Sequence, residues 1–305
     1  MANHLSLEKQ QFILNLLVEG NSLRGATRLS GVHRKTIQNL LVSYGQAAQR
    51  LMDDRLRSLR LKHVEIDEQW TFVRKKQGRL KAQEKLTRFD IGDQYHWYGV
   101  DADTKLVPCH LIGKRSADNA RRLLVDLASR MRFPKPHESD PHAFKAGGYK
   151  PVVKISMDAF TGYREAVDLA FGQHVEYSQI VKDYRNADQP GRYAPPEMIH
   201  ADRRGIRGIE DLLTICTSHV ERCNLTVRTF VKRFVRLTIA FSKKLENLQA
   251  AVALHFCHYN FCWRPRYADD SGRAGQLRPT PAMAAGVVDT LWDIDDLFVA
   301  MRDYL

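Results

Sequence analysis

Three acidic residues of this chain stand where carboxylates could do chemistry together. Asp67 lies midway along an expected strand, Asp158 ends a second one, PVVKISMD, and Glu221 lies near the start of an expected long helix, SHVERCNLTVRTFVKRFVRL. Strand ends and a helix packed over them can converge, and converging carboxylates raise one another's pKa. Hard divalent cations relieve that repulsion. We therefore predict a site for two Mg²⁺ ions, with Mn²⁺ as a substitute, suited to phosphodiester chemistry.

The strand that carries Asp67 holds further acids, in the stretch HVEIDEQW. Alternation along a strand puts Glu65 and Asp67 on one face and Glu68 on the other. Glu65 has either an accessory role in the site or a structural one as a hydrogen-bonded neighbour. We interpret Glu68, which points away from Asp67 in this scheme, as structural.

The long helix carries a predicted row of phosphate-binding groups. Glu221, Asn224, Arg228 and Lys232 are spaced i, i+3, i+7 and i+11, so they share one helical stripe. This spacing predicts that Asn224, Arg228 and Lys232 contact DNA behind a metal-binding acid. The alternative is a solvated basic face.

Charge favours a polyanionic partner. The chain of 305 residues holds 47 Lys and Arg against 35 Asp and Glu, a net charge of +12. Residues 1–62 hold ten basic and four acidic side chains, and residues 222–244 hold seven basic side chains and no acid. Two basic islands of this kind are typical of nucleic-acid binding.

The N-terminal island has the pattern of a helix-turn-helix. Residues 7–46 predict three short helices, with Gly31 in the turn before the third helix and Gly45 at its end. Basic and amide side chains on the third helix suit phosphates and base edges. We predict that double-stranded DNA is contacted by Arg34, Lys35, Thr36, Gln38 and Asn39. A three-helix protein-interaction module is the alternative.

The remaining pattern predicts an α/β domain with a mixed sheet. We expect a helix-turn-helix domain at 1–46, a charged helical linker at 47–62, a catalytic domain at 63–262 and a C-terminal segment at 263–305. Residues 183–217, rich in Arg, Pro and Gly, are expected to form an irregular insertion.

Several classes of protein are disfavoured. Five cysteines without a Cys-x-x-Cys pair argue against a disulfide framework or a structural zinc site. No phosphate-binding Gly-x-x-x-x-Gly-Lys-Ser/Thr loop occurs, so we expect no nucleotide cofactor. The apolar runs are too short to span a membrane, and the N-terminus does not resemble a signal peptide. We expect a cytoplasmic protein, associated with the nucleoid when bound to DNA.

Several blocks of the chain resemble the IS-one (insertion-sequence-one) family of bacterial transposases, closest to members with a helix-turn-helix head in a single chain. They are VEIDEQW, WYGVDADTKLV, DLASRM, TSHVERCNLTVRTFVKRFVRLTIAFSKKLEN, YNF and TPAMAAGVVDTLWDIDDL. The resemblance implies an RNase H-like catalytic domain whose Asp, Asp, Glu triad uses two Mg²⁺ ions. By motif, Asp67 matches the first Asp, Asp158 the second and Glu221 the Glu. Ala159 departs from the usual Gly, and the 134–150 loop is longer than usual.

The resemblance implies a DNA transposase. Residues 1–46 would bind terminal inverted repeats, and the acids would support hydrolysis at the element's end and attack of the freed 3′-hydroxyl on target DNA. Joining two ends implies a homodimer or a larger assembly. Two alternatives stay open: a nuclease of the same fold with a host or defence role, and a non-catalytic helix-turn-helix regulator.

Overall fold

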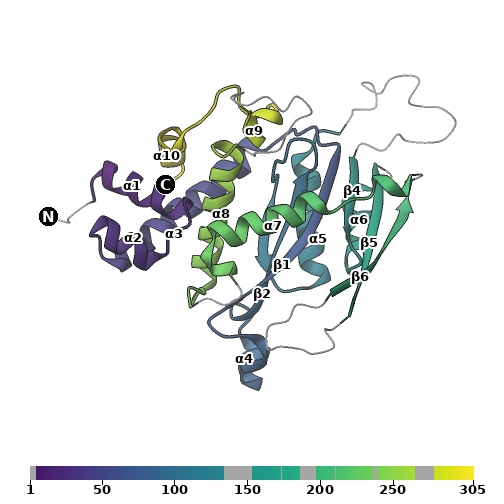
Figure 1. Cartoon of the computed structure of the whole chain (residues 1–305), viewed down its shortest axis with the longest axis horizontal. Helices are drawn as coiled ribbons and strands as arrows, with labels where there is room; N and C mark the ends of the chain where they lie inside the picture. Colours follow the sequence, from purple (N-terminus) through teal and green to yellow (C-terminus); the bar gives the residue numbers. More distant parts are fainter. Residues whose placement is uncertain are drawn as a thin grey trace.

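The computed structural model describes residues 5–133, 153–172, 174–185, 197–209, 211–235, 239–264 and 278–305. The described residues form a helical head, a central sheet with helices on both faces, and a C-terminal helix that returns to the head (Figure 1). The helices are α1 (Leu7–Val18), α2 (Leu23–Ser30), α3 (Arg34–Arg55), α4 (Ala82–Thr87), α5 (Ala117–Arg130), α6 (Tyr163–Phe171), α7 (Ser218–Phe230), α8 (Leu245–Phe261), α9 (Pro281–Ala284) and α10 (Ile294–Arg302). The strands are β1 (His63–Val73), β2 (Gly92–Asp101), β3 (His110–Gly113), β4 (Val153–Asp158), β5 (Val175–Arg185) and β6 (Glu197–Arg207).

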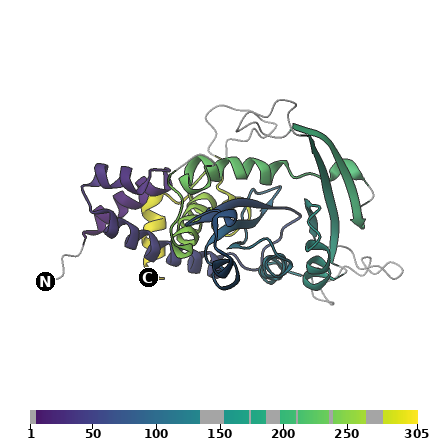
Figure 2. The ribbon, with the colours of Figure 1, turned by 90° about the horizontal axis from the view of Figure 1, so that it is seen from below.

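The sheet is mixed, with strand order β3-β2-β1-β4-β5-β6. β1, β2 and β3 pair in antiparallel fashion, β4 lies parallel to β1 and β5, and β6 pairs antiparallel to β5. Helix α7 covers one face of the sheet, while α5 and α6 cover the other (Figure 2). The mixed sheet with flanking helices that the sequence predicted is confirmed.

The edge of this sheet corrects one expectation. Residues 183–217 were predicted to be irregular, but β5 extends to Arg185 and β6 follows as an eleven-residue strand. Nearly every residue of β6 is exposed. A strand without a buried face lacks the apolar alternation by which strands are predicted, so sequence reasoning missed it. The expected loop at 134–150 lies outside the described residues.

The third helix of the head is longer than predicted. It was expected to end at Gly45, but α3 continues to Arg55 and packs along α8. A Cβ atom on Gly45 would overlap the backbone of Ala250 on α8. Gly45 therefore permits close helix packing and does not terminate the helix. The predicted linker is likewise largely packed, with Ala47, Ala48 and Leu51 fully buried.

We expect Gly45→Ala to lower the free energy of unfolding by about 1–3 kcal/mol, the usual cost of overpacking. This loss would occur although Ala favours helix formation over Gly by about 1 kcal/mol. Gly25→Ala in α2 is the matched control, because its added Cβ would meet only ordinary contacts, the nearest at 3.4 Å from Ser22 Oγ. Urea unfolding of both variants tests this. Equal stability of the two variants would contradict a tight α3–α8 contact.

A group of buried histidines joins the sheet to α8. His96 of β2, His110 of β3 and His255 of α8 surround Phe256, with ring centroids 5.1, 5.3 and 5.2 Å from it. Their ring nitrogens have no hydrogen-bond partner in the described structure. Burial lowers the pKa of His96 well below its ordinary value, that of His110 to about 4 and that of His255 to about 3. All three are therefore neutral at pH 7.

These histidines should make the protein sensitive to acid. Their stabilising contribution is complete above the unfolded pKa of about 6.5 and is lost as the pH falls toward 4, because the unfolded chain then binds more protons. Each should contribute a slope of about 1.4 kcal/mol per pH unit. Urea unfolding between pH 7 and 5 measures how the free energy of unfolding changes with pH. His110→Gln should reduce this slope by the contribution of one histidine, about 1.4 kcal/mol per pH unit. An identical slope in wild type and variant would contradict a neutral, buried His110.

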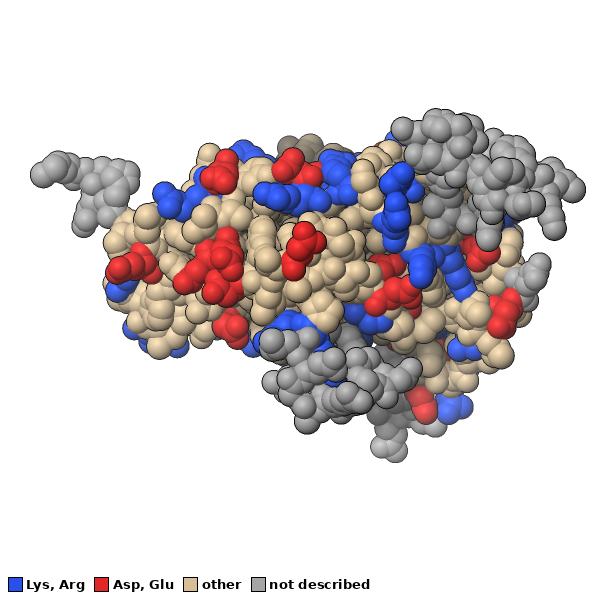
Figure 3. Space-filling view, turned by 90° about the horizontal axis from the view of Figure 1, so that it is seen from above, with Lys and Arg blue, Asp and Glu red and all other residues tan. Residues whose placement is uncertain are grey.

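The outer surface shows no uniform charge. On the face seen from above, acidic and basic side chains are interspersed (Figure 3). Within the described ranges, none of the helices combines the length and apolar character needed to cross a membrane.

Candidate active site

Two of the predicted acids meet because of strand register. β1 and β4 run parallel with Ile66 paired to Met157, so Asp67 and Asp158 come next on neighbouring strands. β4 ends at Asp158, whose Oδ1 accepts a hydrogen bond from the backbone N–H of Phe160 at 3.0 Å. Two residues 91 positions apart in the sequence are thus brought together at the end of one strand.

Glu68 joins this pair, contrary to expectation. Oxygen atoms of Asp67, Glu68 and Asp158 lie within 4.8 Å of one another. Alternation sends Glu68 to the opposite face from Asp67, but both side chains lie where β4 ends, and Glu68 reaches Asp158 from that face. Its side chain is only 2% exposed. Glu68 is therefore part of the acidic cluster, although alternation placed it away from Asp67.

Burial and the neighbouring carboxylates raise the pKa values of two acids in the cluster. The pKa of Glu68 is raised to about 7, first by burial and then by the charge of Asp158. Burial also raises the pKa of Asp67, and a hydrogen bond from Asn224 partly offsets this. Arg115 bridges the cluster, with Nε 2.7 Å from Glu68 Oε1 and Nη2 3.2 Å from Asp158 Oδ2. The hydroxyl of Tyr163 also donates to Glu68 at 2.7 Å.

Asn224 belongs to the interior, not to a DNA-binding surface. Its Nδ2 donates to Asp67 Oδ2 at 2.6 Å, and its Oδ1 accepts from the Tyr98 hydroxyl at 2.8 Å. The residue is 8% exposed. The prediction that Asn224 contacts DNA is corrected: its amide is already engaged in holding Asp67 in place.

Glu65 anchors α7 to the sheet. It is fully buried, and its Oε2 accepts from the backbone N–H groups of His219 and Val220 at 2.7 and 3.0 Å. Its Oε1 lies 2.7 Å from His219 Nδ1. Although burial raises the pKa of Glu65, these hydrogen bonds bring it below its ordinary value. A strand carboxylate thus caps the first turn of α7, where free N–H groups and the helix dipole favour an anion.

Glu221 is held near the cluster but outside it. Its Oε1 accepts from Lys182 and, at 2.9 Å, from the Thr217 hydroxyl. Lys182 also lowers the pKa of Asp67, so its charge acts on both acids. Asn224 lies one turn along α7 from Glu221, and it bonds Asp67 directly. The structure therefore brings Asp67 and Asp158 together and leaves Glu221 paired with a lysine beside them.

The predicted basic stripe is interrupted. α7 ends at Phe230, and Lys232 lies in the separate 3₁₀ turn η4 (Lys232–Phe234). The i+11 position therefore does not continue the helical face of Glu221. Lys232 is exposed and Arg228 is half-buried. Their contacts with DNA stay predictions.

The predicted recognition residues lie at the start of α3. His33 caps this helix, its Nδ1 accepting from Lys35 N at 3.2 Å. The four exposed members of the set are Arg34, Lys35, Thr36 and Asn39. Gln38 is half-buried and bonds Asn247 of α8 at 3.4 Å. The set is accessible for DNA except for this amide, which already joins head and body.

The donor set suits a hard divalent cation. Asp67, Glu68 and Asp158 offer carboxylate oxygens, the ligands that Mg²⁺ and Mn²⁺ prefer. Burial raises the pKa of both Asp67 and Glu68, and Lys182 and Arg115 offset this only in part. A divalent cation would stabilise the ionised carboxylates further, so the residues fit a metal site.

Sequence reasoning missed three groups around these acids: Arg115 before α5, Tyr163 at the start of α6, and Lys182 on β5. No local pattern marks them, because they come from elements far apart in the chain. Glu68 did have a signal, since it follows Asp67 directly at a position where the neighbouring parallel strand ends.

Comparison with known proteins gives little. No protein-family model and no curated protein matches the chain. Among solved structures, it is similar to a Mos1 transposase paired-end complex with the left transposon end, at 13% identity and a TM-score of 0.22. A pre-cleavage Mos1 transpososome gives 14% identity and a TM-score of 0.22. The similarity to each spans 58% of this chain and 60% of the Mos1 chain.

Proposed function

We propose that this protein is a metal-dependent DNA transposase of the IS-one type, with an RNase H-like catalytic domain. The observation that carries the proposal is the meeting of Asp67 and Asp158 on adjacent parallel strands. It is supported by Asn224 of α7, which bonds Asp67 one turn along the helix from Glu221, and by the basic charge of the chain, +12 in all.

The chain's own residues have separate tasks in this proposal. Asp67, Asp158 and Glu221 would hold the metal, with Glu68 as a further acid at its edge. Two Mg²⁺ ions, or Mn²⁺, would supply activation of the attacking oxygen and stabilisation of the leaving one. Asn224 orients the Asp67 carboxylate, and Glu65 fixes the position of α7. Arg115 and Lys182 partly offset the acids' charge through their contacts with Glu68, Asp158 and Glu221.

Binding to element ends is assigned to the head. Residues 1–46 would recognise terminal inverted repeats through the exposed start of α3. Since α3 packs along α8, the recognition helix would be held in a fixed position relative to the acids. Pairing of two ends would require a homodimer or a larger assembly.

The test is an end-cleavage assay. The full-length protein is incubated with Mg²⁺ and a labelled duplex that carries the DNA flanking its own gene. The proposal predicts nicks that leave 3′-hydroxyl ends at fixed positions, followed by strand-transfer products. Cleavage at random positions, with no joined products, would favour the nuclease alternative. Binding without any cleavage would favour the regulator.

A further inference from the structure

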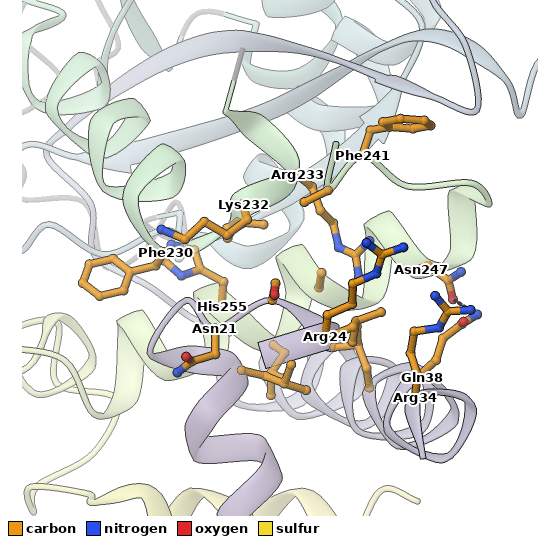
Figure 4. Close-up of a pocket in the computed structure, with 18 of the residues that line it drawn as sticks. Asn21, Arg24, Arg34, Gln38, Phe230, Lys232, Arg233, Phe241, Asn247 and His255 are labelled. Atoms are coloured by element: carbon orange, nitrogen blue, oxygen red, sulfur yellow. Dashed lines mark hydrogen bonds between the residues drawn. The ribbon is translucent and has the colours of Figure 1, made fainter. Parts of the chain in front are cut away.

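A groove separates the head from the catalytic body on the side of α7 and α8. It has a volume of about 730 Å³ and is lined by α1, α2 and α3 on one side and by residues 230–255 on the other. Figure 4 shows Arg24, Arg34 and Gln38 of the head facing Lys232, Arg233 and other residues of the body. This groove is distinct from the acidic cluster.

The groove is strongly cationic. Its lining contains seven basic side chains and no acid: Arg24, Arg28, Arg34, Lys232, Arg233, Lys243 and Lys244. Lys244 pairs with Glu246 at 3.2 Å, outside the lining. Arg233 lies deep, its Nη1 donating to Ser242 Oγ at 2.9 Å, and burial lowers its pKa to about 10. So many cations facing one space are suited to an anion with several charges.

The same groove is lined by aromatic rings and by polar groups. Phe230 and Phe241 line it, and Phe230 stacks on His255 with centroids 6.3 Å apart. His255 is 6% exposed, lines the groove and has no hydrogen-bond partner at either ring nitrogen in the described structure. Asn21 and Asn247 contribute amides. Aromatic faces suit bases, and amide and imidazole groups suit base edges.

We propose that this groove binds unpaired nucleotides of a DNA strand, with phosphates on the basic side chains and a base against Phe230 or Phe241. A volume of about 730 Å³ falls in the range of pockets that enclose one small molecule, about 300–1,000 Å³. An intact duplex could rest only on the rim, out of reach of His255. Single-strand sites elsewhere combine basic grooves and aromatic platforms in this way.

The position of the groove links it to the proposed active site. Glu221 and Phe230 lie on the same helix α7, nine residues apart, and a helix rises about 1.5 Å per residue. A strand held in the groove would thus reach the acids over roughly 14 Å, the length of a few nucleotides. This link rests on the proposed function, but the binding itself does not.

The test measures binding without catalysis. A fluorescein-labelled hexathymidine is titrated with the full-length protein in EDTA, and fluorescence anisotropy is recorded. Phe241→Leu should weaken binding roughly tenfold, the lower part of the range for loss of one stacked base. Arg24→Ala/Lys243→Ala should weaken binding through lost phosphate contacts and reduce its dependence on salt. The control is Lys81→Ala/Lys85→Ala around α4, which removes the same charge elsewhere and should leave binding within about twofold of wild type.

Two competitors separate the possible sources of binding. An abasic hexamer should compete much more weakly than hexathymidine, and thymidine 5′-monophosphate should not compete at equal concentration. Equal loss of binding in the groove and control variants, an abasic strand that binds as well, or a mononucleotide that binds as tightly would each overturn the proposal. Failure of the end-cleavage assay would leave these binding results unaffected, so the two proposals fail separately.

Discussion

Asp67→Asn, Asp158→Asn and Glu221→Gln will each reduce the rate of end cleavage by roughly a hundredfold to a thousandfold or more. Enzymes that lose one transition-state-stabilising group slow by about this factor. Each substitution keeps the side-chain shape and removes the charge that would bind a cation. DNA binding in EDTA should stay near that of wild type, since the predicted recognition residues lie on α3. Initial nicking rates in Mg²⁺ and binding curves in EDTA give the two readouts.

The matched control is Asp103→Asn, which removes a carboxylate charge from an exposed turn. It should leave nicking unchanged. If any one of the three substitutions also leaves nicking near wild type, that residue does not bind the metal. Retained activity in Glu221→Gln together with loss in Glu68→Gln would assign the third acid to Glu68, which already contacts the cluster.

Glu65→Gln will lower both stability and activity, although Glu65 does not itself bind metal in this account. The carboxylate accepts two backbone N–H groups of α7 and contacts His219. Removing a charged acceptor from a buried set of hydrogen bonds costs about 1.5–3 kcal/mol. Because α7 then loses its anchor, Asn224 and Glu221 should shift relative to Asp67. We expect nicking to fall by about 10–100-fold, the usual effect of losing a partner that orients metal ligands.

Urea unfolding and nicking rates measure the two effects, and Glu176→Gln on β5 is the control for removing a carboxylate from the sheet. Titration of Mn²⁺ separates positioning from simple loss of fold: the folded Glu65→Gln protein should recover part of its rate at higher Mn²⁺. Wild-type stability with a wild-type rate would show that Glu65 does not position α7.

The convergence of Asp67 and Asp158 could be predicted from the sequence for a physical reason. Asp67 and Asp158 both lie on apolar strands whose pattern is visible, and parallel neighbours bring equivalent positions together. The role of Glu221 stays a prediction, based on its place at the start of α7. The sequence could not show that Lys182 forms an ion pair with Glu221, or that Arg115 bridges Glu68 and Asp158. These contacts depend on tertiary packing.

The errors have equally specific causes. Glycine is common at helix ends, so Gly45 was predicted to end the helix. Its role is instead to permit close packing against Ala250, some two hundred positions away in sequence. Asn224 has the spacing of a surface stripe, but α7 turns that position toward Asp67. β6 lacks a buried face and so lacks the alternation that identifies strands. Gly45 and Asn224 contact residues distant in sequence, and β6 has no buried face, so local sequence patterns could not predict any of the three.

The position of the metal tests the account most directly. Crystals of the protein with an end-DNA duplex and Mn²⁺ would locate the ions by anomalous scattering. The account predicts peaks on the order of 2.0–2.2 Å from carboxylate oxygens of Asp67 and Asp158, with Glu221 released from Lys182 and completing the site. Peaks bound instead between Glu65, Cys216 and His219, the other cluster of possible ligands among the described residues, or no bound Mn²⁺ beside Asp67, would contradict it.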